Sequence, residues 1–257
     1  MKLGLLLSIL SLCFTSIVSP SETLAKEPLK VVFGISRPPF IDNDPPRGIS
    51  WELANAVFKK MQVEIIPSFY PNKRMERALI QGDVDIAVEV QPTHPDLYYS
   101  NPFISYRNFV VTRKREDITF RNWQDLTGYR VNAWQGALFH LGTGFRKVMR
   151  GFKLYKEFPL QKAQVQRWLL GSFDAIIIDE TLLAWWIQTI LPSLNEAERN
   201  QLDLNFTYAP VPQNNELWWY VGFRDPKLRD TFNIHLQSIQ QNGDYARIRE
   251  QYKLPTH

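Results

Sequence analysis

The chain has 257 residues, of which 44% are hydrophobic and 22% charged, and its formal net charge is +4. These values are typical of a globular protein of one or two domains, and they exclude a disordered, collagen-like or polytopic membrane chain. The excess of basic residues is small and its densest run covers only residues 113–115, so the sequence does not indicate a nucleic-acid-binding surface.

The first 25 residues have the pattern of a secretory signal peptide. Lys2 supplies a positive charge, residues 5–18 are apolar, and small residues precede a cleavage site after Ala25. Two alternatives stay open: a lipoprotein with Cys13 at its mature terminus, and an uncleaved anchor. Cleavage would remove Cys13, the single cysteine, and with it any disulfide, thiolate metal site or cysteine nucleophile. We therefore expect export to the periplasm of a Gram-negative type of cell.

Strands and helices alternate in the first half of the chain. Apolar runs rich in β-branched residues indicate strands, and apolar residues spaced three or four apart indicate helices. These patterns predict a strand, a helix, a strand, a helix and a strand at residues 29–35, 49–61, 63–66, 73–81 and 85–90, with Pro67 closing the second strand. This order favours a largely parallel sheet with helices on both faces.

The same alternation starts again after Asp125. The predicted strands are at residues 130–134, 152–155 and 175–178, and the predicted helices at residues 138–149, 160–170 and 181–190. Gly142 and Gly144 weaken the first of these helices. The chain therefore predicts a second α/β unit after the first.

Two segments are expected to cross between the two units. Residues 103–112 lead out of the first unit and residues 204–211 return to it, after which a strand at 217–223 and two helices complete it. We expect a signal peptide at 1–25, a first lobe at 26–112 plus 206–257, and a second lobe at 113–205.

The two units share a short pattern. Residues 79–89 and 169–179 each contain a glycine at a helix end, an aspartate three residues later and an apolar strand that ends in a carboxylate. Chance similarity is the alternative to a repeated lobe. Because open parallel sheets bind ligands at the carboxyl ends of their strands, Glu89 and Asp179 are expected to face a cleft between the lobes.

Short motifs extend along residues 29–254. They are Pro38-Pro39-Phe40, Gly48 with Glu52-Leu53, Ala78-Leu79 with Gly82 and Asp85, Ser100-Asn101-Pro102-Phe103, residues 123–128, Gly136, and residues 174–179. In this order and spacing they resemble the bacterial extracellular solute-binding proteins of family 3, the polar amino acid type. The resemblance implies an α/β, periplasmic-binding-protein-like fold of type II, with two parallel-sheet lobes joined by two crossover segments that close on a ligand.

The resemblance also implies which groups hold the ligand. Amino-acid binders of this family hold the ligand amine with an aspartate that ends a strand of the second lobe, and Asp179 matches it. They hold the carboxylate with the arginine of a Thr-x-x-Arg motif, but here Thr93 is followed by Asp96 at that position. A bidentate arginine–carboxylate contact is strong and directional. Either another arginine replaces it, with Arg74 and Arg37 the candidates, or the ligand is not a simple α-amino acid.

The remaining candidate ligand-binding residues are aromatic or small. Aromatic rings can stack on flat ligands or hold cations, and those expected near the cleft are Phe40, Trp51, Tyr70, Tyr106, Trp134, Trp218 and Trp219. Gly136 lies where the family offers backbone donors. The structural alternatives are core positions for the rings, a solvated strand end for Glu89, a helix N-cap for Asp179, and surface positions for Arg74 and Arg37.

The sequence favours a binding protein over an enzyme. The four histidines show no metal-binding spacing and neither a Gly-x-Ser-x-Gly motif nor a complete phosphate loop is present, so we expect no metal or cofactor. The resemblance implies a monomer that captures a small polar, amine-bearing solute for an ABC-type membrane permease. Two alternatives stay open: a cyclohexadienyl-dehydratase-like enzyme, with Glu89, Asp179 and Glu180 as acid–base groups, and a ligand sensor without transport.

Overall fold

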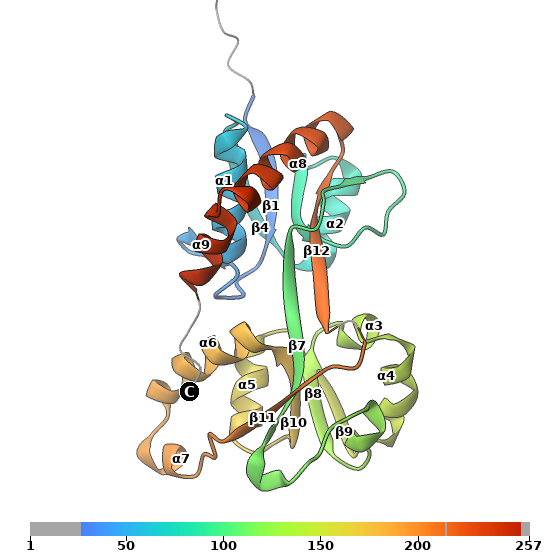
Figure 1. Cartoon of the computed structure of the whole chain (residues 1–257), viewed down its shortest axis with the longest axis vertical. Helices are drawn as coiled ribbons and strands as arrows, with labels where there is room; N and C mark the ends of the chain where they lie inside the picture. The colour runs from blue at the N-terminus through green and yellow to red at the C-terminus, as the bar shows by residue number, and fades with distance from the viewer. Residues whose placement is uncertain (1–26, 214, 253–257) are drawn as a thin grey trace, which may run out of the picture.

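A computed structural model describes residues 27–213 and 215–252 of the chain. They fold into two lobes, which form the upper and lower halves of Figure 1. The predicted signal peptide lies outside the described residues. Within them, no helix is long and apolar enough to cross a membrane.

Lobe 1, the upper half of Figure 1, contains the elements predicted for the first unit. Its main strands and helices are β1 (Leu29–Gly34), α1 (Ile49–Lys60), β4 (Ile65–Tyr70), α2 (Asn72–Gln81), β5 (Ile86–Val90), β12 (Glu216–Phe223), α8 (Pro226–Gln241) and α9 (Asp244–Glu250). β1 pairs in parallel with β4 and β5, and β12 pairs antiparallel with β5. The sequence did not predict the short strands β2 (Asp42–Asn43), β3 (Pro46–Arg47) and β6 (Tyr98–Tyr99).

Lobe 2 repeats the alternation of strand and helix. Its elements are β8 (Arg130–Trp134), α3 (Ala137–His140), α4 (Gly142–Val148), β9 (Leu154–Phe158), α5 (Gln161–Leu169), β10 (Ala175–Asp179), α6 (Glu180–Ile190), α7 (Glu196–Asn200) and β11 (Phe206–Pro210). β8 pairs in parallel with both β9 and β10. The single helix expected over residues 138–149 is two helices, because Gly142 adopts a φ of 84° and turns the chain between them. The short helix α7 was not predicted.

One long strand belongs to both lobes. β7 (Ile104–Arg113) pairs with β12 over residues 104–107 and with β10 and β11 over residues 108–113. The chain returns from lobe 2 to lobe 1 through β11 and β12, so two segments cross between the lobes (Figure 1). The resulting sheet has the strand order β4-β1-β5-β12-β7-β10-β8-β9. The predicted α/β fold with two lobes and two crossover segments is confirmed.

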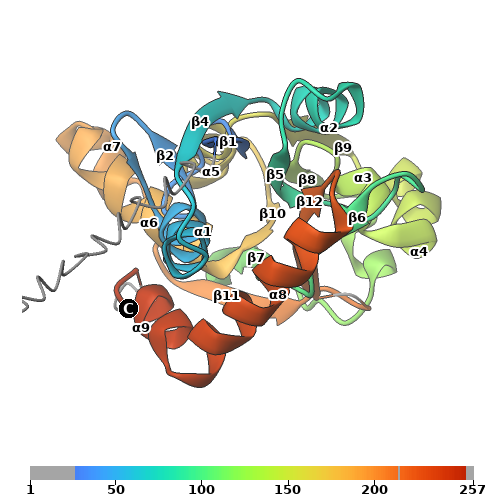
Figure 2. The same ribbon diagram turned by 90° about the horizontal axis from the view of Figure 1, so that it is seen from above.

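Helices cover both faces of the parallel strands, as the apolar runs in the sequence require. In β1, Val31 and Phe33 belong to the core that α1 and α8 cover, whereas Val32 packs with Met75 and Leu79 of α2. Figure 2 shows α1 and α2 on opposite sides of β1. β10 alternates in the same way between a core shared with α5 and α6 and a core shared with α3 and α4.

The pattern shared by the two units has a structural counterpart. Asp85 accepts a hydrogen bond from the Lys30 N–H at 2.8 Å and donates its own N–H to the Lys30 carbonyl at 2.9 Å. Asp174 makes the same exchange with Arg130, at 2.7 and 2.8 Å. This aspartate ties the turn after α2 to the start of β1 in lobe 1, and the turn after α5 to the start of β8 in lobe 2.

One expected strand boundary is wrong. Pro67 does not close the second strand but lies inside β4. A proline has no N–H to donate to a neighbouring strand, which excludes it from central strands. β4 is the edge strand of the sheet and pairs with β1 on one side only, which is where a proline is tolerated.

Candidate functional site

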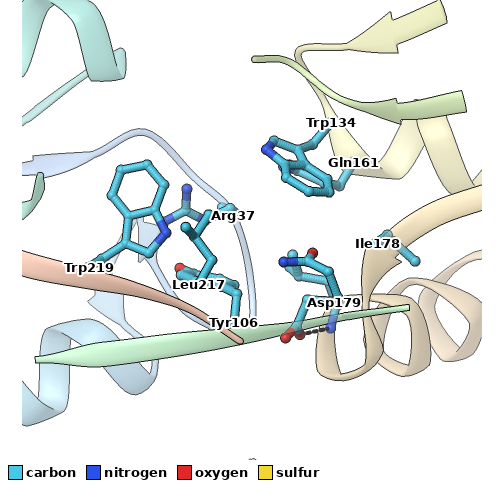
Figure 3. A pocket seen from close by; sticks show the side chains of 10 residues that line it. Arg37, Tyr106, Trp134, Gln161, Ile178, Asp179, Leu217 and Trp219 are labelled. Atoms are coloured by element: carbon cyan, nitrogen blue, oxygen red, sulfur yellow. Dashed lines mark hydrogen bonds between the residues drawn. The ribbon is translucent and has the colours of Figure 1, made fainter. Parts of the chain in front are cut away.

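A cavity that is open to solvent lies between the lobes, at the carboxyl ends of the parallel strands, and the empty space in it and at its mouth is about 390 Å³. Its lining residues are Arg37, Leu217 and Trp219 from lobe 1, Tyr106 and Asn108 from β7, and Trp134, Gln161, Ile178, Asp179 and Leu182 from lobe 2. Figure 3 shows that these side chains surround one space. A molecule bound there would contact both lobes.

The lobe 1 side of the cavity contains a buried ion pair. Arg37, in the loop after β1, donates to the carboxylate of Glu89 in β5. Glu89 also accepts from the Ser50 hydroxyl, and from the Tyr106 hydroxyl at 2.8 Å. Its backbone has a φ of 65°, which is uncommon for a residue with a side chain. Glu89 is therefore not a solvated strand end but lies behind Arg37 and Tyr106, which line the cavity.

Burial and mutual contact set the charges in this cluster. Burial lowers the pKa of Arg37, but Glu89 and Tyr106 raise it more, so the guanidinium stays charged. Burial raises the pKa of Tyr106 well above its usual value, so its hydroxyl stays neutral and donates to Glu89. The Arg37 guanidinium lies 5.1 Å from the centre of the Tyr106 ring. The charge of Arg37 is thus matched by a carboxylate of the protein itself.

Asp179 supplies a carboxylate on the lobe 2 side. It ends β10 and is the N-cap of α6, where it accepts hydrogen bonds from the N–H groups of Thr181 at 2.9 Å and Leu182 at 3.0 Å. Its other oxygen accepts from the Arg107 N–H at 2.8 Å. Burial raises the pKa of Asp179 to about 6, although these three donors lower it. The capping role considered from the sequence is present, and the same side chain also lines the cavity.

Three aromatic side chains form much of the cavity wall: Tyr106, Trp134 and Trp219. In Figure 3, Trp134 and Trp219 come from opposite lobes and lie on two sides of the central space. His140 packs on Trp219 with ring centres 5.6 Å apart, so the lobes touch beside the cavity. Burial lowers the pKa of His140, which keeps its imidazole neutral near pH 7.

Two amide side chains also line the cavity. Asn108 lies on β7, where the strand passes from lobe 1 to lobe 2, and Gln161 lies at the first turn of α5. Asn108 is only 5% exposed, and its amide has no hydrogen-bond partner within the described part of the chain. Because Asn108 lines the cavity, its amide can reach a ligand there.

Other predicted site residues lie outside this cavity. Phe40 is fully buried and packs on Tyr106 with ring centres 4.2 Å apart. Trp51 packs on lobe 1 aromatic side chains. Tyr70 and Arg74 stack at 4.2 Å and line a separate surface cavity on α2. The structure therefore brings Arg37, and not Arg74, to the cavity that contains Asp179.

The loop that contains Gly136 has an internal partner. The N–H groups of Gly136 and Leu138 donate to the carboxylate of Glu157, each at 2.7 Å. The hydroxyl of Tyr155 donates to the same carboxylate at 2.9 Å. Glu157 was not identified from the sequence, because β9 brings it beside this loop from 21 residues away.

Sequence reasoning also missed the cavity residues Asn108, Gln161, Ile178, Leu182 and Leu217. Ile178 and Leu182 flank Asp179 and could have been inferred from it. Asn108 and Leu217 come from the crossover strands, whose pairing brings them to the cavity. Over residues 27–213 and 215–252, no group of three or more histidine, cysteine or acidic side chains could hold a metal ion.

Solved structures with this fold include a substrate-binding protein, a sensor domain and an ancestral amino-acid-binding protein. The amino acid ABC transporter substrate-binding protein AbpA from Streptococcus pneumoniae, bound to L-arginine, is 18% identical, with a TM-score of 0.64 over 87% of this chain and 93% of that chain. A histidine kinase sensor domain with similarity to periplasmic binding proteins is 17% identical, with a TM-score of 0.69 over 89% and 96%. The ancestral amino-acid-binding protein AncCDT-1, a precursor of cyclohexadienyl dehydratase, is 18% identical, with a TM-score of 0.65 over 87% and 94%. No curated protein sequence matches the chain.

Two α/β lobes, two crossover segments and a cavity between the lobes define a periplasmic-binding-protein-like fold of type II. The family model for bacterial extracellular solute-binding proteins, family 3, matches residues 29–255. The chain belongs to this family, which confirms the resemblance drawn from its motifs.

Proposed function

We propose that this chain captures a small polar, amine-bearing solute of the amino acid type between its lobes and delivers it to an ABC-type permease. The observation that carries the proposal is Asp179, a buried carboxylate of lobe 2 that faces a cavity completed by lobe 1. The family supports solute binding, and the structurally similar AbpA is bound to L-arginine, which carries amines. Action as a monomer in the periplasm, after removal of a signal peptide, is part of the same proposal.

The charges around the cavity support an amine. Arg37 and Glu89 neutralise each other, so the carboxylate of Asp179 leaves the site with a net negative charge. A protonated amine would be attracted to this charge, and the rings of Trp134 and Trp219 can also hold a cation. The amide of Asn108 can then satisfy a further polar group of the solute.

A calorimetric screen of amino acids, polyamines and short peptides tests the proposal. We expect saturable one-to-one binding of at least one amine-bearing compound, lost when its amine is acetylated. Binding that is confined to compounds without an amine would refute the proposal.

Ligand is expected to close the lobes. Only a closed state contacts the solute from both sides, so binding shifts the population toward that state. Small-angle X-ray scattering should show a smaller radius of gyration at saturation than without ligand. An unchanged radius at saturation would contradict a hinge mechanism.

Binding is expected to weaken in acid because of Asp179. Its pKa of about 6 means that the carboxylate is ionised at pH 7.5 and mostly protonated at pH 5. The solute amine stays charged over this range, so the ion pair is lost as the pH falls. We expect affinity about tenfold lower at pH 5 than at pH 7.5, measured by calorimetry in matched ionic strength. The fall in affinity between pH 7.5 and pH 5 should be absent in Asp179→Asn. Equal affinity at the two pH values in the unmodified protein would contradict this prediction.

An enzyme on the same fold is the competing proposal. AncCDT-1 is described as a precursor of cyclohexadienyl dehydratase, and a carboxyl group with a pKa of about 6 can act as a general acid or base. Of the expected acid–base groups, however, Glu89 is bonded to three donors and Glu180 is paired with Arg107. We therefore expect no aromatic product when the protein is incubated with prephenate or arogenate, and turnover would favour the enzyme.

A sensor would use the same ligand site without a permease. The histidine kinase sensor domain with this fold makes that role a second alternative. Deletion of the gene should abolish uptake of the identified solute if the protein serves transport. Unchanged uptake in the deletion strain would favour the sensor.

A further inference from the structure

Two groups beside the cavity could bind the carboxylate of a solute. Each of them is already bonded to a carboxylate of the chain itself. Carboxylates are bound by cationic side chains or by backbone N–H groups. Arg37 is the one cationic side chain among the described residues that line the cavity, and its partner is Glu89. Arg37 bonds Glu89 through Nη2, whereas its buried Nε–H has no partner among the described residues. A solute carboxylate could therefore reach Arg37 only beside the Glu89 carboxylate, whose negative charge opposes it.

Glu89 is fixed in this position. It accepts from Arg37, Ser50 and Tyr106, and its side chain is 6% exposed. Its left-handed backbone conformation is one that a residue with a side chain keeps only where its surroundings hold it. The Glu89 carboxylate is thus held in place behind the cavity wall, and a solute cannot readily displace it from Arg37.

A second internal carboxylate fills the loop after Trp134. Glu157 accepts the N–H groups of Gly136 and Leu138, and it also accepts from the hydroxyl of Tyr155, which lies two residues earlier on the same face of β9. These backbone donors adjoin the cavity because Trp134, two residues before Gly136, lines it. They are therefore not open to a solute carboxylate.

The groups that remain available suit an amine. Asp179 provides a negative charge, Asn108 an amide that lines the cavity, and Trp134 and Trp219 two ring faces from opposite lobes. Resting on the proposed function and narrowing its amino-acid-like solute, we propose that the solute keeps the amine of an amino acid but lacks its carboxylate. Glu89 and Glu157 determine this specificity, because Glu89 neutralises the charge of Arg37 and Glu157 occupies the N–H groups of Gly136 and Leu138.

Matched pairs of compounds test the inference directly. Each pair consists of an amino acid and the amine formed by its decarboxylation: lysine and cadaverine, arginine and agmatine, histidine and histamine, tryptophan and tryptamine. Calorimetry on the purified protein should show at least one amine that binds about tenfold or more tightly than its parent amino acid, which corresponds to about 1.4 kcal/mol.

A variant tests the role of Glu89. Glu89→Gln keeps the shape and an acceptor oxygen but removes the charge that neutralises Arg37. We expect the ratio of amino acid to amine affinity to rise about tenfold in this variant, as Arg37 becomes available to the carboxylate. Glu64→Gln is the matched control, because Glu64 is exposed and precedes β4, at the opposite end of the strands from the cavity. If Glu89→Gln does not fold, two measurements still test the inference. They are the affinity ratio of amino acid to amine in Glu157→Gln, and the same ratio in the unmodified protein.

The outcomes separate this inference from the proposed function. Tighter binding of the amino acid in every pair would overturn the inference and keep the proposed function, and would place the carboxylate elsewhere, for example at the start of α5. An unchanged ratio in both glutamate variants would overturn the specificity role of the two residues. Absence of binding by both series would overturn the inference and the proposed function together.

Discussion

Asp179→Asn is expected to weaken binding of an amine-bearing solute by roughly 30-fold to several thousand-fold. Asp179 is 3% exposed and faces the cavity, so its pair with an ammonium group would be largely shielded from water. Loss of one partner of such a desolvated pair costs roughly 2–5 kcal/mol, and each 1.4 kcal/mol corresponds to about tenfold in affinity. Calorimetric titration with the best amine identified in the screen measures the change.

The asparagine variant separates ligand pairing from helix capping. Asparagine also accepts hydrogen bonds at a helix N-terminus, so the cap on α6 is retained and only the charge is lost. Asp225→Asn is a matched control, because Asp225 caps α8 in the same way, through the Lys227 N–H at 2.8 Å, and does not line the cavity. Full affinity in Asp179→Asn would assign Asp179 to capping alone.

The fold was predictable because its main signals are local. Strands such as β10 are apolar at consecutive positions, which indicates burial on both faces, and α1 shows helical spacing from its first residue. The errors arose where a local signal depends on tertiary position. A proline would end a central strand, but Pro67 is tolerated inside β4 because β4 is an edge strand. From the sequence, Gly142 could either weaken a single helix or turn the chain between two helices. In the structure its positive φ turns the chain.

The candidate site was only partly predictable because its decisive contacts join distant residues. Asp179 could be identified from the strand that precedes it. The pairing of Arg37 with Glu89 joins residues 52 positions apart, through a loop that has no periodic pattern. The sequence therefore indicated Arg37 as a replacement for the family arginine without showing that a carboxylate of the protein already neutralises it. Asn108 gave no signal, because its place in the cavity depends on the register of β7 with its neighbours.

Stability depends on a different arginine. Arg113, the last residue of β7, has a side chain that is 1% exposed. It donates to the carbonyls of Trp168 and, at 2.8 Å, Phe173, and two of its nitrogens bond Glu116 at 3.0 and 2.9 Å. Through these bonds the end of α5 and the turn before β10 are tied to β7.

Arg113→Ala is expected to destabilise the protein by about 3–5 kcal/mol. The substitution leaves the Phe173 carbonyl without its donor and the Trp168 carbonyl with only the Gly171 N–H, and it removes a buried cation from its carboxylate partner. For a chain of this size each kcal/mol lowers the melting temperature by roughly 2–4 °C, so calorimetry or circular dichroism should record a fall of about 6–20 °C. Arg113→Lys should recover only part of it, because an ammonium cannot reproduce the planar fork of donors. Arg115→Ala is the control: Arg115 is 49% exposed, and removing its side chain should change stability by less than about 0.5 kcal/mol. Equal melting temperatures for the two alanine variants would refute the structural role of Arg113.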